Sequence, residues 1–123
     1  MTIERIEQNG KIIAVITGTE KLLTDVQSSL DLLMTAKYEA ETNLLAVDKN
    51  VIAEDFFILS RGLAGEVLQK FINYQAKIAI YGDFSKYTSK PLKDFIYECN
   101  KGKDIFFLPT KEDTIERLAG LAK

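Results

Sequence analysis

The stretch KIAIYGDFSKYTSKPLKDF, residues 77–95, decides the fold class of this chain. It begins with a short apolar run, Lys77 to Tyr81, of the kind that forms a strand buried on both faces. A polar loop then leads to Thr88 or Ser89, either of which can cap a helix that starts near Pro91. A buried strand followed directly by a helix is the repeating unit of a parallel α/β sheet.

Further strands are predicted on both sides of this unit. Leu44 to Val47 and Ile105 to Leu108 are similar apolar runs. At the N-terminus, Ile3–Ile6 and Lys11–Thr17 flank the dipeptide Asn9-Gly10, which favours a tight two-residue hairpin. The sequence therefore predicts a mixed sheet of about five strands, with an antiparallel N-terminal hairpin and a largely parallel remainder.

About four helices complete the predicted pattern and cover the sheet. We expect them at about Asp25–Lys37 after a cap at Thr24, at Glu54–Tyr74, from near Pro91 to a left-handed C-cap at Gly102, and after a Thr110 cap through Ile115, Leu118 and Leu121. Glu54–Tyr74 carries the broadest apolar stripe and is the predicted main core helix, although Gly62 and Gly65 inside it each cost roughly 1 kcal/mol against alanine. We expect a single α/β domain over residues 1–123 of the chain.

Composition narrows the functional class. The 123 residues carry a formal net charge of −2, so no basic field is present to gather nucleic acid, and we predict no nucleic-acid partner. No apolar run approaches the roughly 20 residues that cross a bilayer. The single Cys99 cannot form an intrachain disulfide, and the first residues lack a signal-peptide core, so we expect a cytoplasmic protein without a membrane role.

Residues that commonly perform catalysis are scarce. The chain has no histidine, which removes the most frequent general base and metal ligand. Cys99 falls on the apolar stripe of its helix and is expected to pack in the core; redox or acyl chemistry would need it as an accessible thiolate. Glu54 and Asp55 are neighbours that would point about 100° apart on a helix, which does not make a metal or acid–base pair. We predict no catalytic residues, no metal and no cofactor.

The loop after Lys77–Tyr81 is the candidate binding surface. It lies at the carboxyl end of a predicted parallel strand, where open α/β sheets form their ligand crevice, and it precedes a helix N-terminus that favours anions. The candidate residues combine cations, hydroxyls and a carboxylate: Asp83, Ser85, Lys86, Tyr87, Ser89 and Lys90, with Arg61 as a further cation. The alternative interpretation is structural, because serine and threonine also turn chains and cap helices while lysines stay solvated.

Three strings resemble a bacterial family catalogued only as a domain of unknown function, family 4180. They are residues 55–57 (DFF), 62–71 (GLAGEVLQKF) and 82–87 (GDFSKY). The resemblance extends over nearly the whole chain. It implies a bacterial cytosolic origin and no particular activity.

The predicted element order is also similar to the STAS domains of anti-anti-sigma factors, which have a Gly-Leu near the start of a long helix. Gly62-Leu63 matches that position here. In those regulators the serine or threonine directly before the Gly-Leu is phosphorylated, whereas this chain has Arg61 there and Ser60 one residue earlier. The resemblance implies a STAS-like layer fold whose phosphorylation switch is lost or displaced.

Two functional hypotheses follow. The first is a non-enzymatic regulatory or protein-interaction module that uses the candidate loop. The second is a binding protein or enzyme for a small anionic ligand, with Lys86, Lys90 and the helix N-terminus holding the anion and Arg61 assisting. A homodimer through an exposed sheet edge or a helix face is also possible.

Overall fold

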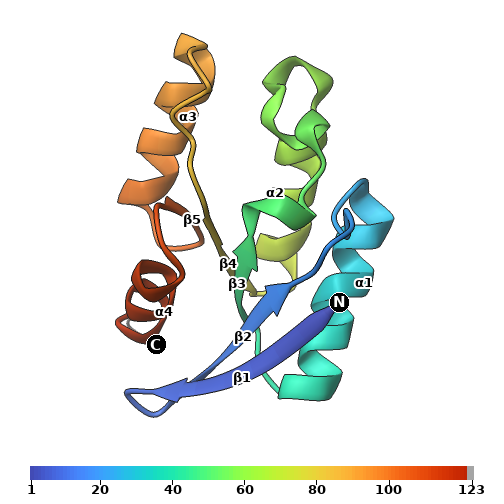
Figure 1. The fold of residues 1–123 in the computed structure, drawn as a ribbon, viewed down its shortest axis with the longest axis vertical. Coiled ribbons are helices and arrows are strands. Elements are labelled where there is room, and N and C mark those ends of the chain that lie inside the picture. Colours follow the sequence, from blue (N-terminus) through green and yellow to red (C-terminus); the bar gives the residue numbers. More distant parts are fainter. Residues whose placement is uncertain (122–123) are drawn as a thin grey trace.

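A computed structural model describes residues 1–121 of the chain. Five strands form one sheet in the order β1-β2-β3-β4-β5 (Figure 1). Their bounds are β1 Thr2–Gln8, β2 Lys11–Thr17, β3 Leu44–Asp48, β4 Lys77–Tyr81 and β5 Ile105–Leu108. β1 pairs with β2 antiparallel, and each later pair is parallel. The predicted α/β class and mixed sheet are confirmed.

The N-terminal hairpin forms as its turn residues predict. Asn9 and Gly10 have φ angles of 55° and 76°, so both central positions of the turn are left-handed. Gln8 pairs with Lys11 directly across this turn, and the register continues to Thr2 opposite Thr17. A two-residue turn of this kind matches the natural twist of the two strands, and it fixes the register of the whole hairpin.

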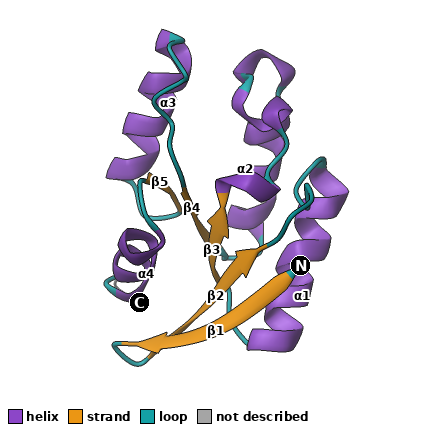
Figure 2. Ribbon diagram, in the orientation of Figure 1, coloured by secondary structure: helices purple, strands orange, loops and turns teal. Residues whose placement is uncertain are grey.

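Four α-helices and three short 3-10 helices connect and cover the strands (Figure 2). They are α1 Val26–Ala40, η1 Lys49–Val51, η2 Glu54–Phe57, η3 Leu59–Arg61, α2 Leu63–Asn73, α3 Lys90–Lys101 and α4 Lys111–Ala119. The first three α-helices link successive neighbouring strands, and crossovers of one hand place all three on the same face. In Figure 1, α1 lies toward the β1 end of the sheet, α3 toward the β5 end, and α2 between them. The fourth, α4, follows the last strand and packs on the opposite face.

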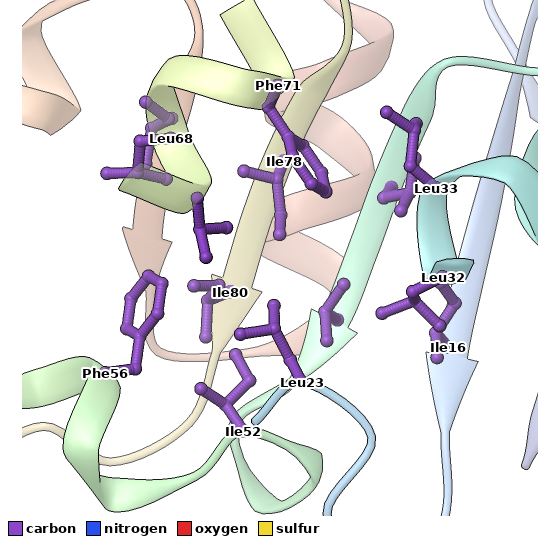
Figure 3. Packing of buried hydrophobic residues seen from close by; sticks show 14 of the residues in the cluster. Ile16, Leu23, Leu32, Leu33, Ile52, Phe56, Leu68, Phe71, Ile78 and Ile80 are labelled. Carbon is purple, nitrogen blue, oxygen red and sulfur yellow. The ribbon is translucent and has the colours of Figure 1, made fainter. Parts of the chain in front are cut away.

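The larger core lies between the sheet and α1, α2 and α3. Ile78 and Ile80 of β4 face this side, and Phe71 of α2 is fully buried against them. Figure 3 shows Phe71 beside Ile78, and Leu23 beside Ile52 where two loops meet. Each fully buried Leu, Ile or Phe contributes roughly 1.5–3 kcal/mol to folding, so this face supplies most of the apolar stabilisation.

The second core is smaller and has a single covering helix. Ala46 of β3 pairs with Ala79 of β4, and both are fully buried. These small side chains leave space for Ile115 and Leu118 of α4 to pack on the middle of the sheet. One nine-residue helix can therefore bury the centre of this face.

The predicted long helix over Glu54–Tyr74 is wrong. The segment is divided into η2, η3 and α2, and only Leu63–Asn73 is α-helical. Gly62 is the cause of the break, because its φ of 79° is left-handed and it begins α2 as an N-cap residue. The chain turns there instead of continuing as one cylinder, and this turn keeps η2 near the ends of the strands.

Three predicted helix ends also differ. Asp25, not Thr24, caps α1, because its side chain accepts the Ser28 N–H while Ser28 Oγ accepts the Asp25 N–H. Gly102 has a φ of −88°, so α3 ends without the expected left-handed residue. The last helix stops at Ala119 and does not include Leu121.

Candidate functional site

The predicted loop lies at the carboxyl end of β4 and packs against the segment that follows β3. Its aromatic side chains make the contact: Tyr87 stacks on Phe57 of η2, with ring centroids 4.9 Å apart and planes at 20°. Phe84 packs edge-on against Phe107 of β5 at 5.7 Å. Such aromatic pairs are each worth about 0.5–1.5 kcal/mol beyond their buried area, so they hold the loop on the sheet.

Glu54 is the polar centre of this region. Lys86 Nζ donates a hydrogen bond to Glu54 Oε1 at 3.0 Å, and the Tyr87 hydroxyl donates one to Glu54 Oε2 at 2.9 Å. The hydrogen bond from Lys86 holds the pKa of Glu54 below its ordinary value, with a further contribution from Tyr87. Burial and the neighbouring Glu54 raise the pKa of the Tyr87 phenol. Both carboxylate oxygens are thus occupied, and η2 is tied to the loop.

Lys49 is the least solvated cation in this region. It directly follows β3, and only 13% of its side chain is exposed. Its stem lies across Gly82 at the end of β4, which has a φ of 154°. A β-carbon at Gly82 would lie 2.7 Å from Lys49 Cβ and 3.1 Å from Lys49 Cδ. Glycine is therefore required for both the backbone conformation and the close approach.

The Lys49 ammonium has aromatic neighbours and only a distant anion. Its Nζ lies 5.0 Å from the centre of the Tyr87 ring and 5.5 Å from that of Phe57, which are cation–π distances. The nearest ion pair is with Glu54 Oε1 at 3.9 Å. Burial lowers the pKa of Lys49, and the positive charge of Lys86 lowers it further. This ammonium is held in a partly desolvated position.

The other predicted site residues have local structural partners. The Asp83 carboxylate accepts the backbone N–H of Ser85 at 2.8 Å, and hydrogen bonds from the Ser85 side chain and then from its backbone lower the pKa of Asp83. Ser89 caps α3, and Lys90 forms an ion pair with Asp94 at 2.8 Å. The structure therefore brings Lys86 and Tyr87 together around Glu54, and it gives Asp83, Ser85, Ser89 and Lys90 turn, capping and ion-pair roles.

Arg61 lies in η3 and forms an exposed ion pair with Asp55 at 3.8 Å. The groove between η3 and α3 is lined by Ser60 and Ser89 rather than by Arg61. The predicted cation Arg61 therefore does not share this groove with the start of α3, whereas its neighbour Ser60 does.

Two grooves flank the loop and the start of α3. The first, of about 320 Å³, is lined by Phe57, Ile58, Leu59, Ser60, Ser89 and Pro91. The second, of about 390 Å³, is lined by Phe84, Ser85, Tyr87, Lys93, Ile96, Tyr97 and Asn100. Ile58 is 42% exposed and Tyr97 is 63% exposed, so each groove has a large apolar side chain open to solvent.

Sequence reasoning missed Lys49 and the role of Glu54. The available signal was position, because Lys49 follows a buried strand just as the predicted loop follows the next one. Carboxyl ends of neighbouring parallel strands meet at one edge of the sheet, so residues directly after each strand were candidates for one site. Glu54 was considered together with Asp55, as a metal or acid–base pair, so its contact with Lys86 was not predicted.

Cys99 is partly buried and packs against the larger core, in line with its predicted packing role. Burial raises the pKa of the thiol, so the protonated form is favoured at neutral pH. Within residues 1–121, no group of three or more cysteine, aspartate or glutamate side chains is arranged to hold a metal ion. None of the helices in this part of the chain has the length and apolar character needed to cross a membrane.

The fold and this site define an α/β domain with polar and aromatic side chains gathered at the carboxyl edge of its parallel strands. The chain belongs to the family described as a domain of unknown function (DUF4180), whose model matches residues 8–118. No curated protein and no solved structure matches it.

Proposed function

We propose that this chain is a cytoplasmic, non-enzymatic regulatory module that binds a protein partner at the surface around residues 83–91. The observation that carries this proposal is the pair of grooves on either side of that loop, with Ile58 and Tyr97 at their margins. Exposed aromatic and aliphatic side chains beside shallow grooves are typical of the centres of protein interfaces.

The network around Glu54 supports this role because it holds the loop in one arrangement before a partner arrives. Lys86 and Tyr87 are bonded to one carboxylate, and Tyr87 also stacks on Phe57. A surface that is already ordered loses less conformational entropy when it binds, which leaves more of the contact energy for affinity.

The resemblance of the sequence to STAS domains also supports a regulatory role. Gly62 and Leu63 stand at the start of α2, as the Gly-Leu of those regulators stands near the start of a helix. In this resemblance, Arg61 corresponds to the residue that is phosphorylated in those regulators. We therefore propose regulation through binding itself, without a phosphorylation step at this position.

The test is affinity capture from a cell that naturally produces the protein, with three baits. They are the unchanged chain, a double variant Ile58→Asp with Tyr97→Asp, and a control Tyr38→Asp. Tyr38 is 88% exposed on α1, away from both grooves, so the control adds a charge without touching the proposed surface.

We expect a protein that the unchanged chain and the Tyr38→Asp control retain and that the double variant loses. Capture of the same proteins by all three baits would contradict the proposal, as would the absence of any protein specific to the unchanged chain. Size-exclusion chromatography of each bait also checks the predicted homodimer, since a dimer that uses this surface would dissociate in the double variant.

A further inference from the structure

Three lysines from three different loops meet at the carboxyl edge of the sheet. Lys21 follows β2, Lys49 follows β3 and Lys86 follows β4. Hydrogen bonds join the segments that carry Lys21 and Lys49. The backbone N–H groups of residues 22 and 23 donate to Val51 O at 2.7 and 3.0 Å, and the Lys21 side-chain Nζ donates to Asn50 O at 2.9 Å. Their positions are therefore set by the fold.

The negative charges in this region are fewer and already committed. Glu54 uses one oxygen for Lys86 and the other for Tyr87. Asp83 accepts the N–H of Ser85. Both carboxylates attract the Lys49 charge, and both other lysines repel it. Among Lys49 and the four charged groups that act on it, three are positive and two are negative, which leaves an excess of one positive charge; Asp48, directly before Lys49, is not among them and accepts the Asn50 N–H at 2.8 Å.

The excess charge is centred on Lys49. Within residues 1–121, its ammonium finds no hydrogen-bond acceptor, and its ion pair with Glu54 spans 3.9 Å. No buried side-chain nitrogen in this part of the structure lacks a hydrogen bond, so Lys49 Nζ reaches the solvent. Its N–H donors are thus available to an external acceptor, while its stem is fixed against Gly82 and two aromatic rings.

We infer that Lys49 and Lys86 bind the carboxylate of an external ligand whose apolar body rests on the adjoining aromatic side chains. One carboxylate balances the excess charge of the five groups centred on Lys49, whereas a phosphate dianion would exceed it. Tyr87, whose ring centre lies 5.0 Å from Lys49 Nζ, is only partly buried and lines the groove that also contains Phe84 and Tyr97, so apolar surface adjoins the ammonium on that side. This site does not depend on the proposed partner-binding role.

Two sources can supply such a carboxylate: a free aryl or alkyl carboxylic acid, or an acidic side chain flanked by apolar residues in another protein. The first arm of the test is a titration of the full chain with benzoate, followed by backbone amide NMR at constant ionic strength and pH 7. Acetate and inorganic phosphate serve as comparison anions. The second arm uses a short peptide with one glutamate between two leucines.

We expect saturable shifts of the amides of residues 49–50 and 82–87 with benzoate, at least threefold tighter than with acetate or phosphate. Lys49→Met should weaken this binding at least tenfold, Lys86→Met should weaken it less, and Lys49→Arg should retain part of it. Lys37→Met is the matched control, because Lys37 is an exposed lysine in the last turn of α1, outside the cluster and both grooves, and it should leave the affinity unchanged.

The inference is overturned if benzoate produces no saturable shift, if phosphate binds more tightly than benzoate, or if Lys49→Met and Lys37→Met behave alike. If the amide spectrum of Lys49→Met shows that this variant is not folded, Lys49→Arg and Lys86→Met test the site instead. A Lys86→Met variant that binds benzoate as tightly as the unchanged chain would then count against the site. Tighter binding of the peptide than of benzoate assigns the carboxylate to a protein, and the reverse assigns it to a small molecule.

Discussion

Lys49 lies so close to the backbone of Gly82 that the two positions cannot both carry a β-carbon in the present conformation. A β-carbon at Gly82 would approach Lys49 Cβ to 2.7 Å, and the φ of 154° is itself unfavourable for any other residue. This contact joins the end of β3 to the end of β4. The contact fixes the stem of the Lys49 side chain and therefore the position of its ammonium group.

Gly82→Ala should therefore destabilise the protein by about 2–4 kcal/mol, the combined cost of a strained backbone and an overpacked contact. Urea unfolding followed by circular dichroism measures this change. A loss of unfolding free energy below about 0.5 kcal/mol would mean that Lys49 can move away freely, and it would contradict the claim that its ammonium is held in a fixed position.

Gly65→Ala is the matched substitution at a glycine without such a contact. Gly65 lies in α2 with ordinary φ, and an added β-carbon there meets nothing within 4 Å. Alanine is favoured over glycine in helices by up to about 1 kcal/mol, so this variant should be more stable than the unchanged chain. The same urea experiment checks it, and a destabilised Gly65→Ala would contradict the open space around the added β-carbon.

Tyr87→Phe isolates the hydroxyl that binds Glu54. The ring and its stacking on Phe57 remain, and only the 2.9 Å hydrogen bond is removed. We expect a loss of about 0.5–1.5 kcal/mol, the usual net value of one hydrogen bond. If thermal unfolding of Tyr87→Phe matches that of the unchanged chain, the hydroxyl contributes nothing to holding the loop.

Glu54→Gln should change how stability depends on pH. The folded-state pKa of Glu54 lies below its ordinary value of 4.5, so its charged form stabilises the fold above that pH. This contribution is lost as the pH falls through the folded-state pKa. The side chain is 51% exposed, and the effect is accordingly limited to about 1 kcal/mol. Unfolding free energies between about pH 5 and pH 3 should fall less steeply in Glu54→Gln, and parallel slopes would contradict this role for Glu54.

Local sequence signals predicted the strands and the hairpin, because these depend on neighbouring residues. Asn9-Gly10 specifies its turn wherever it occurs between two strands, and the apolar runs at β3, β4 and β5 have few other ways to be buried. The break at Gly62 was missed for a physical reason. Apolar residues recur every three or four positions on both sides of it, and 3-10 and α-helices share that spacing.

The candidate site was predictable only in part. Lys86 and Tyr87 follow directly from the position of their loop after a buried strand. Lys49 also directly follows a buried strand, but its low exposure depends on the missing side chain of Gly82 and on two rings from other segments, which position alone does not predict. Lys49 and the loop that carries Tyr87 lie together because β3 and β4 are neighbours in the sheet. No local sequence pattern predicts that strand order.

The most direct test of the proposed function is the affinity of the purified chain for the partner that it captures. Isothermal titration calorimetry should show at least tenfold weaker binding for Ile58→Asp with Tyr97→Asp, and a change of less than twofold for Tyr38→Asp. Equal affinities for the unchanged chain and the double variant would contradict the claim that the surface around residues 83–91 binds the partner.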